Sequence, residues 1–138
     1  MSLNLNLIKD RFSEIEASLS RLESFQKIPK KEFLADQDAL DVACYRLLVA
    51  IEAALQICYH ITAKKLSKVP EEYAECFAIL GQAGILNDQL SQNLQQMARF
   101  RNLLIHTYWK IDYERLYEIL NNHLEDLRAF VKAIANLL

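Results

Sequence analysis

The amino-acid sequence predicts an all-α protein in which residues 1–138 form a single domain, an antiparallel bundle of about five helices. Apolar residues recur at every third or fourth position along four long segments, which is the period of a helix with one buried face. The chain has only 2 Gly and 2 Pro, so it offers few of the tight turns that connect strands. No segment alternates apolar and polar residues as a strand does, so we expect no sheet.

The first helix is expected to begin at a cap, Asn4 or Asn6, whose side chain can accept a hydrogen bond from the first turn. It should end before Ile28-Pro29, because the residue before a proline avoids the helical conformation. Its apolar stripe comprises Ile8, Phe12, Ile15, Leu19 and Leu22.

A second helix is expected from Asp36 or Asp38 to about Lys65. It carries two neighbouring apolar stripes, which predicts a central helix that is buried on more than one side. No apolar run is expected to reach the length of a membrane span. The first stripe comprises Leu40, Cys44, Leu47, Ile51, Leu55 and Cys58, and the second comprises Val42, Tyr45, Val49, Ala53 and Ile57.

Three further helices are expected in the second half of the chain. A short one has Pro70 in its first turn and is ended by Gly81 and Gly84, with the apolar residues Tyr73, Phe77 and Leu80. The fourth helix is capped by Asn87 and has a stripe of Leu90, Leu94, Met97, Leu104 and Tyr108. The fifth is capped by Asp112 and has a stripe of Leu116, Leu120, Leu127, Phe130, Ile134 and Leu137. The connections are short, so neighbouring helices should run antiparallel.

Composition and charge exclude several classes of protein. A hydrophobic fraction of 52% excludes a disordered chain. The formal net charge of -2 does not favour general nucleic-acid binding, so any contact with RNA must use a local basic patch. Residues 1–10 lack the basic start and apolar stretch of a secretion signal. We therefore expect a cytoplasmic protein with no membrane partner.

Metal-ion and cofactor sites are not expected either. The three cysteines show no paired spacing, and we expect Cys44, Cys58 and Cys76 to be buried free thiols. His60 and His123 lie far from His106 in the sequence, and no cluster of ligand types is apparent. His123 falls on the stripe of the fifth helix, where a core or interface histidine is the simpler interpretation.

Arg101 occupies a position where the stripe of the fourth helix predicts an apolar side chain. A permanently charged guanidinium there must find an anion, a partner or a water-filled cleft. One possibility is an intramolecular ion pair with Glu52, which interrupts the apolar run of the second helix. The other possibility is a functional anion site, and the residue pattern leaves both open.

His106 lies on the same helix as Arg101 but not on the same face. Five residues of an ideal helix turn the side chain by about 140°, whereas Tyr108 returns to within about 20° of Arg101. Either the helix loosens near His106, or two copies of the segment meet across a dimer. Asn102 lies one turn before His106 and can orient the imidazole by a hydrogen bond.

The segment from Arg101 to Tyr108 closely resembles the R-x-x-x-x-H-x-Y motif of HEPN domains in the HepT toxin family. Three stretches around it also look like family segments, and the likeness extends from about Ile8 to Phe130. These stretches are residues 45–54, 69–77 and 97–109. The resemblance implies a helical bundle of the HEPN type.

The resemblance also implies an activity, an RNA endonuclease that needs no metal ion, and DNA is not an expected partner. The chemistry suits the residues: the 2′-hydroxyl of RNA is the nucleophile, His106 transfers a proton and Arg101 holds the charged phosphate. The family further implies a partner, a minimal nucleotidyltransferase antitoxin of the MntA type that adds AMP to the motif tyrosine. Tyr108 matches that tyrosine.

The leading hypothesis is thus a homodimeric ribonuclease toxin, with Arg101 and His106 catalytic and with Asn102, Tyr108 and Glu52 supporting. Two alternatives remain: a non-catalytic HEPN module that binds a nucleotidyltransferase or a nucleotide, and a purely structural bundle. Six lysines are also undecided between solubility and contact with phosphates. They form two groups, Lys27, Lys30 and Lys31, and Lys64, Lys65 and Lys68.

Overall fold

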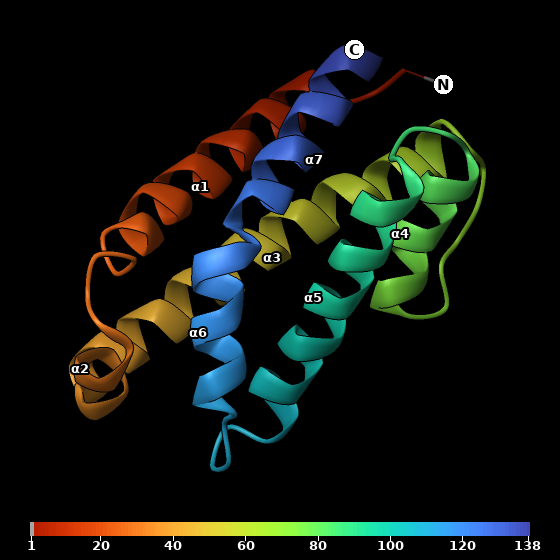
Figure 1. Ribbon diagram of the computed structural model, residues 1–138. Helices are drawn as coiled ribbons and strands as arrows, with labels where there is room; N and C mark the ends of the chain where they lie inside the picture. Colours follow the sequence, from red (N-terminus) through yellow and green to blue (C-terminus); the bar gives the residue numbers. More distant parts are fainter. Residues whose placement is uncertain (1) are drawn as a thin grey trace.

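The computed structural model describes residues 2–138, and this part of the chain contains helices and no strand. The all-α prediction is confirmed, with seven helices in place of about five (Figure 1). The helices are α1 (Leu5–Glu23), α2 (Lys30–Ala35), α3 (Gln37–Lys64), α4 (Tyr73–Gln82), α5 (Asp88–His106), α6 (Tyr113–Asn122) and α7 (Leu124–Leu137).

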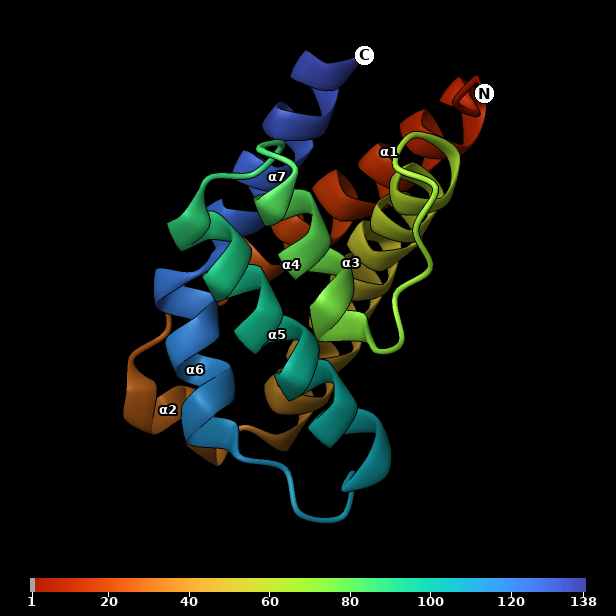
Figure 2. The same ribbon diagram turned by 90° about the vertical axis from the view of Figure 1, so that its right-hand side faces the viewer.

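The long central helix α3 organises the bundle, as the double stripe predicted. It contacts α1, α2, α4, α5 and α7, and α1 runs antiparallel along it (Figures 1 and 2). Several of its buried residues are alanines, which let neighbouring helices approach closely, and Leu47 and Ile57 fill the space between them. The core is therefore continuous around one helix.

The length and composition of α3 correct one expectation. It is the one helix among residues 2–138 that is long and apolar enough to cross a membrane, although no such run was expected. Half of its apolar window is buried inside the protein, since other helices pack on several of its sides. A core helix passes the same test of length and hydropathy, and that is the role α3 has here.

Side-chain caps begin four of the helices. Asn4, Asp36, Asn87 and Asp112 each accept a hydrogen bond from a backbone N–H in the first turn, at 2.8 to 3.2 Å. The four caps were among those predicted, and they settle the two alternatives at Asn6 and Asp38, which both lie inside helices.

Two departures from the expected elements explain the higher helix count. The segment after Pro29 forms α2, whose Phe33 is buried against Phe25 and Tyr117, with ring centroids 5.8 Å apart in each pair. The expected fifth helix is broken at His123, where a φ of -129° interrupts the helical conformation between α6 and α7. The apolar stripe continues across this break, so the pattern did not reveal it.

The crossing of α4 and α5 depends on Gly81. This glycine lies in the last turn of α4, where a Cβ atom would come within 2.5 Å of the Ser91 hydroxyl oxygen. Gly81 was expected to end the helix, but it instead permits a close approach between α4 and α5. Gly84 makes the turn with a φ of 77°. Because α4 and α5 run antiparallel, the start of α4 lies beside the end of α5 (Figure 2).

Candidate active site

Arg101 is the one buried charged residue of the described chain, with 8% of its surface exposed. Its Nε donates a hydrogen bond to Oε1 of Glu52 on α3, and the two side chains form an ion pair. The intramolecular pair that the sequence left open is therefore present. It joins α5 to the central helix and gives the buried guanidinium a counter-ion.

The guanidinium of Arg101 has further contacts that fix its plane. Its Nη1 donates to Oδ1 of Asn102 at 3.0 Å. Its central carbon lies 4.3 Å from the centroid of the Tyr73 ring at the start of α4, a cation–π contact. Within residues 2–138 no hydrogen bond joins Nη2 to a protein acceptor. This nitrogen remains able to bind an anion.

His106 is exposed and is the last residue of α5. The helix does not loosen before it, because α5 is regular up to His106 and ends at Thr107, whose N–H still bonds to the carbonyl oxygen of Leu103 at 2.8 Å. Asn102 bonds to Arg101 rather than to His106, so its expected role in orienting the imidazole is not seen. Within residues 2–138 of one chain, no hydrogen bond or ion pair joins Arg101 to His106.

Tyr108 lies outside the helix, contrary to the expected stripe. The chain turns after Thr107, and Lys110 donates its backbone N–H to the carbonyl oxygen of Thr107 at 2.8 Å. The Tyr108 ring is 70% exposed and contacts Trp109, with centroids 5.2 Å apart. The helical angle between Tyr108 and Arg101 therefore does not apply, and the phenol is accessible on a short loop.

An open pocket lies where α3, α4 and α5 meet. Asn102 and His106 line it from α5, and Arg101 stacks on the ring of Tyr73, which forms part of its wall. The pocket brings together side chains from three separate parts of the sequence. The complete lining is Tyr59, Glu71, Glu72, Tyr73, Asn102 and His106.

Four of these lining residues were not identified from the sequence as site residues. Tyr73 was assigned only to an apolar stripe, although it is 37% exposed and contacts both Arg101 and Tyr59. Glu71 and Glu72 gave one overlooked signal: two acidic residues stand where a helix start usually has Ser, Thr, Asp or Asn. Tyr59 gave no signal beyond its place on a buried helix.

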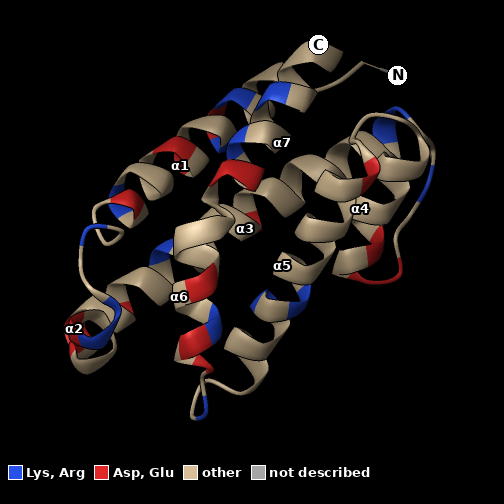
Figure 3. Ribbon diagram, in the orientation of Figure 1, with Lys and Arg blue, Asp and Glu red and all other residues tan. Residues whose placement is uncertain are grey.

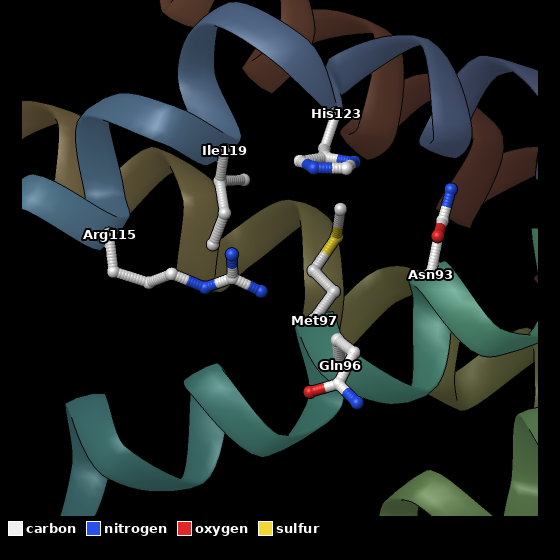
Figure 4. A pocket seen from close by; sticks show the side chains of 6 residues that line it. All are labelled: Asn93, Gln96, Met97, Arg115, Ile119 and His123. Carbon is white, nitrogen blue, oxygen red and sulfur yellow. The ribbon is translucent and has the colours of Figure 1, made fainter.

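The other two histidines have structural roles. The ring nitrogen Nε2 of His60 accepts a hydrogen bond from the backbone N–H of Asn4 at 2.8 Å. His123 is half-buried at the break between α6 and α7, where its Nδ1 lies 2.9 Å from Asp126. It lines a separate pocket with Arg115 and Met97, among other residues (Figure 4). His123, which was expected in the core or at an interface, instead lies half-buried where α6 and α7 join.

The two lysine groups differ in their surroundings. Lys30 forms an ion pair with Glu114 at 2.6 Å, and the hydrogen bond in this pair raises the pKa of the lysine. Lys64, Lys65 and Lys68 lie at the end of α3 and on the connection to α4. That connection changes from basic to acidic as it approaches α4 (Figure 3).

The cysteines are free thiols, as expected, but only two are buried. Cys58 and Cys76 are fully buried and Cys44 is half-buried. Burial raises the pKa of the Cys44 thiol to about 11 and raises that of Cys58 further. Within residues 2–138 no three His, Cys, Asp or Glu side chains are grouped to hold a metal ion.

An all-α bundle that places Arg101 and His106 on the last turns of one helix, followed by Tyr108 on a loop, has the features of a HEPN-class protein. The sequence model of the family described as ribonuclease HepT-like matches residues 15–134. The match covers most of the chain, and the protein belongs to this family of ribonucleases.

Curated relatives agree over nearly the full length. The mRNA nuclease HepT of Shewanella oneidensis is 24% identical over 129 residues, which cover 94% of this chain and 96% of the relative. The tRNA nuclease HepT of Aphanizomenon flos-aquae is 26% identical over 128 residues, which cover 93% of this chain and 87% of the relative.

Solved structures share the fold. A tri-AMPylated HEPN toxin of Shewanella oneidensis in complex with MNT antitoxin gives a TM-score of 0.86 at 24% identity, covering 94% of this chain and 97% of the toxin chain. YutE from Bacillus subtilis, a cytosolic protein of unknown function, gives a TM-score of 0.81 at 18% identity. The match covers 99% of this chain and 91% of the YutE chain. At these identities the likeness establishes the bundle architecture.

Proposed function

We propose that this protein is an endoribonuclease toxin that cleaves RNA without a metal ion and is paired with a nucleotidyltransferase antitoxin. The observation that carries the proposal is the state of Arg101. Its guanidinium is buried and fixed by Glu52, Asn102 and Tyr73, while Nη2 keeps no protein partner among the described residues. A pre-positioned cation with free donors is what a developing phosphorane needs.

The proposed reaction uses the nucleophile that RNA carries. The 2′-hydroxyl oxygen attacks the adjacent phosphorus, the bond from phosphorus to the 5′ oxygen breaks, and a 2′,3′-cyclic phosphate forms. The 2′ proton must leave and the 5′ oxygen must gain a proton, and His106 serves this transfer because it is exposed at the pocket. DNA lacks the 2′-hydroxyl and should not be cleaved.

Two copies of the chain complete the site in this proposal. Arg101 and His106 project from different faces of α5, with no contact between them inside one chain, and a two-fold axis near the end of α5 would bring the complementary groups together. Apolar side chains are exposed at this end of the helix and on the following loop, which favours a second copy as the occupant. They are Leu103, Ile105, Tyr108 and Trp109, with 36% to 72% of their surface exposed.

The antitoxin is proposed to act on Tyr108. Its phenolic oxygen would attack the α-phosphorus of ATP in the partner nucleotidyltransferase, form a phosphodiester with AMP and release pyrophosphate, and the phenolic proton would pass to solvent. The high exposure of Tyr108 supports access for a partner enzyme. The Shewanella oneidensis toxin of the same fold is tri-AMPylated in its complex with MNT antitoxin. We expect the pair to act in the cytoplasm.

The first test measures RNA cleavage by the purified protein in excess EDTA. Cleavage should persist and leave 2′,3′-cyclic phosphate ends. His106→Ala should lose about a hundredfold or more in rate, the usual contribution of a proton-transfer group. His123→Ala is the matched control and should cleave normally. Loss of cleavage in EDTA, or a His106→Ala protein of full activity, would refute the assignment.

The second test concerns assembly and modification. Light scattering should find a dimer at micromolar protein, and Trp109→Glu should weaken it. After co-expression with a neighbouring nucleotidyltransferase, mass spectrometry should find AMP on the peptide containing Tyr108. Inhibition without that adduct would instead indicate that the partner masks the site.

One observation favours the alternative of a non-catalytic HEPN module. Arg101 already has a counter-ion in Glu52, so it satisfies its charge without RNA. A folded dimer that binds the nucleotidyltransferase but cleaves no RNA would establish this alternative.

A further inference from the structure

We infer that the pocket beside Arg101 binds a nucleobase next to the scissile phosphate and selects guanine. The inference rests on the proposed ribonuclease function and names its base specificity. The position of the pocket is the first support, because His106 and Asn102 line it and the guanidinium of Arg101 stacks on the ring of Tyr73, which also lines it. A nucleotide whose phosphate binds Arg101 therefore has this pocket within reach of its base.

The wall of the pocket is aromatic. Tyr59 and Tyr73 have centroids 5.9 Å apart and planes at 79°, so each ring fixes the other. Burial raises the pKa of Tyr59 to about 12, which keeps this part of the wall uncharged. Single-stranded RNA is commonly recognised by bases that leave the stack and pack against aromatic side chains. The wall suits a flat, uncharged ligand.

The start of α4 adds two carboxylates to the lining of the pocket, those of Glu71 and Glu72. Glu72 is the N-cap of α4, yet its side chain makes no capping hydrogen bond. Glu75 interacts with the helix start instead, and its Oε2 accepts a bond from the backbone N–H of Glu71 at 3.2 Å. Within residues 2–138 neither Glu71 nor Glu72 forms a side-chain ion pair or hydrogen bond. Both can accept hydrogen bonds from a ligand.

These carboxylates would oppose a ligand that offers only phosphates. Two negative charges beside a phosphate site repel RNA unless the bound group donates hydrogen bonds to them. A base can supply those donors, so the acidic side of the pocket should act as a filter rather than as a general RNA surface.

Among the four bases, guanine matches a carboxylate best. Its N1–H and N2–H₂ groups stand side by side and can donate to both oxygens of one carboxylate. Adenine and cytosine place an acceptor ring nitrogen beside their amino group, and uracil has a single N–H between two carbonyl oxygens. A carboxylate therefore meets an unfavourable acceptor in each of the other three bases.

The test compares short RNAs that differ at a single position beside the cleavage site. The wild-type protein should cleave the guanine-containing RNA about tenfold or more faster than the other three, the scale of one good bidentate contact. The double variant Glu71→Gln with Glu72→Gln should lose that preference while its Tm stays unchanged.

The matched control is Glu14→Gln with Glu32→Gln, which makes the same change in charge at two exposed sites away from the pocket. It should keep the preference for guanine. Cleavage by the wild-type protein without base preference, or an equal loss of preference in the control, would overturn the inference and leave the ribonuclease proposal intact.

If the protein cleaves no RNA, the ribonuclease proposal fails and binding decides the inference separately. Titration with 5′-GMP should then shift NMR signals from Tyr59, Tyr73 and His106 at lower concentration than 5′-AMP, 5′-CMP or 5′-UMP. Equal response to the four nucleotides would exclude a guanine pocket.

Discussion

His106 and His123 both lie at helix ends, but they differ in the contacts that their imidazole rings make. His123 joins α6 to α7 with its Nδ1 2.9 Å from Asp126 and its Nε2 3.5 Å from Glu118. His106 ends α5 with an exposed ring, and no hydrogen bond or ion pair is found for it within residues 2–138. A histidine with carboxylates at both nitrogens is held in place, whereas an exposed one is free to exchange protons.

The arginines near these histidines show the same contrast. Arg115 pairs with Glu118 one turn away at 2.7 Å, and both side chains are substantially exposed. Arg101 pairs with Glu52, 49 residues away in the sequence, and is nearly buried. A local surface pair adds little to stability, while a long-range buried pair must be built by the whole fold.

The difference indicates which of the two clusters, around His106 or around His123, is a binding site. Around His123 the opposite charges satisfy one another within α6 and the start of α7. Around His106, three groups have no protein partner among residues 2–138: Nη2 of Arg101 and the carboxylates of Glu71 and Glu72. Unsatisfied groups in a pocket indicate a binding site, and satisfied ones indicate a structural joint.

The largest expected effect separates the two arginines by activity. Arg101→Lys keeps the charge but loses the planar fork that bonds to Glu52 and Asn102 and lies on Tyr73. RNA cleavage should fall about a hundredfold or more, as when a preorganised donor to a developing anion is removed. Arg115→Lys should retain full activity, and equal losses in the two variants would remove the distinction between the clusters.

A smaller effect separates the two glutamates by stability. Glu52→Gln leaves the buried guanidinium without its counter-ion, and the free energy of unfolding should fall by about 1–3 kcal/mol, since partial exposure of Glu52 moderates the full cost of a broken buried pair. Glu118→Gln should cost less than about 1 kcal/mol at neutral pH, because Glu118 is exposed and its partners are only half-buried. Urea unfolding measures both, and a greater cost at Glu118 would contradict the comparison.

Local signals in the sequence explain why much of the fold was predictable. Caps such as Asn87 and Asp112 bond to their own first turns, and the apolar periods reflect burial within single helices. The short helix α2 and the break at His123 escaped prediction because tertiary contacts decide both. Phe33 is buried by rings from other segments, and the stripe continues unbroken past His123.

The candidate site was predictable only in part for the same physical reason. Arg101 was conspicuous because a charge interrupted an apolar stripe, and Glu52 was the natural partner by the same argument. Tyr73 and Tyr59 resembled ordinary core residues, since nothing local distinguishes an aromatic ring that packs inside from one that supports an arginine. The loop position of Tyr108 also had no local signal, because no Gly or Pro follows His106 to end the helix.

The smallest expected effect is the change with pH in the stability lost by Glu118→Gln. Glu118 has its pKa held below the usual value of 4.5, chiefly by the hydrogen bond from Arg115, with a lesser effect of His123. A lowered carboxyl pKa adds stability that is complete above the unfolded-state pKa and is lost as the pH falls through the folded-state pKa. The deficit of Glu118→Gln relative to wild type should therefore be visible near pH 6 and shrink toward about pH 3 in urea unfolding. A deficit that grew in acid would show that Glu118 stabilises the α6–α7 joint by some means other than its charge.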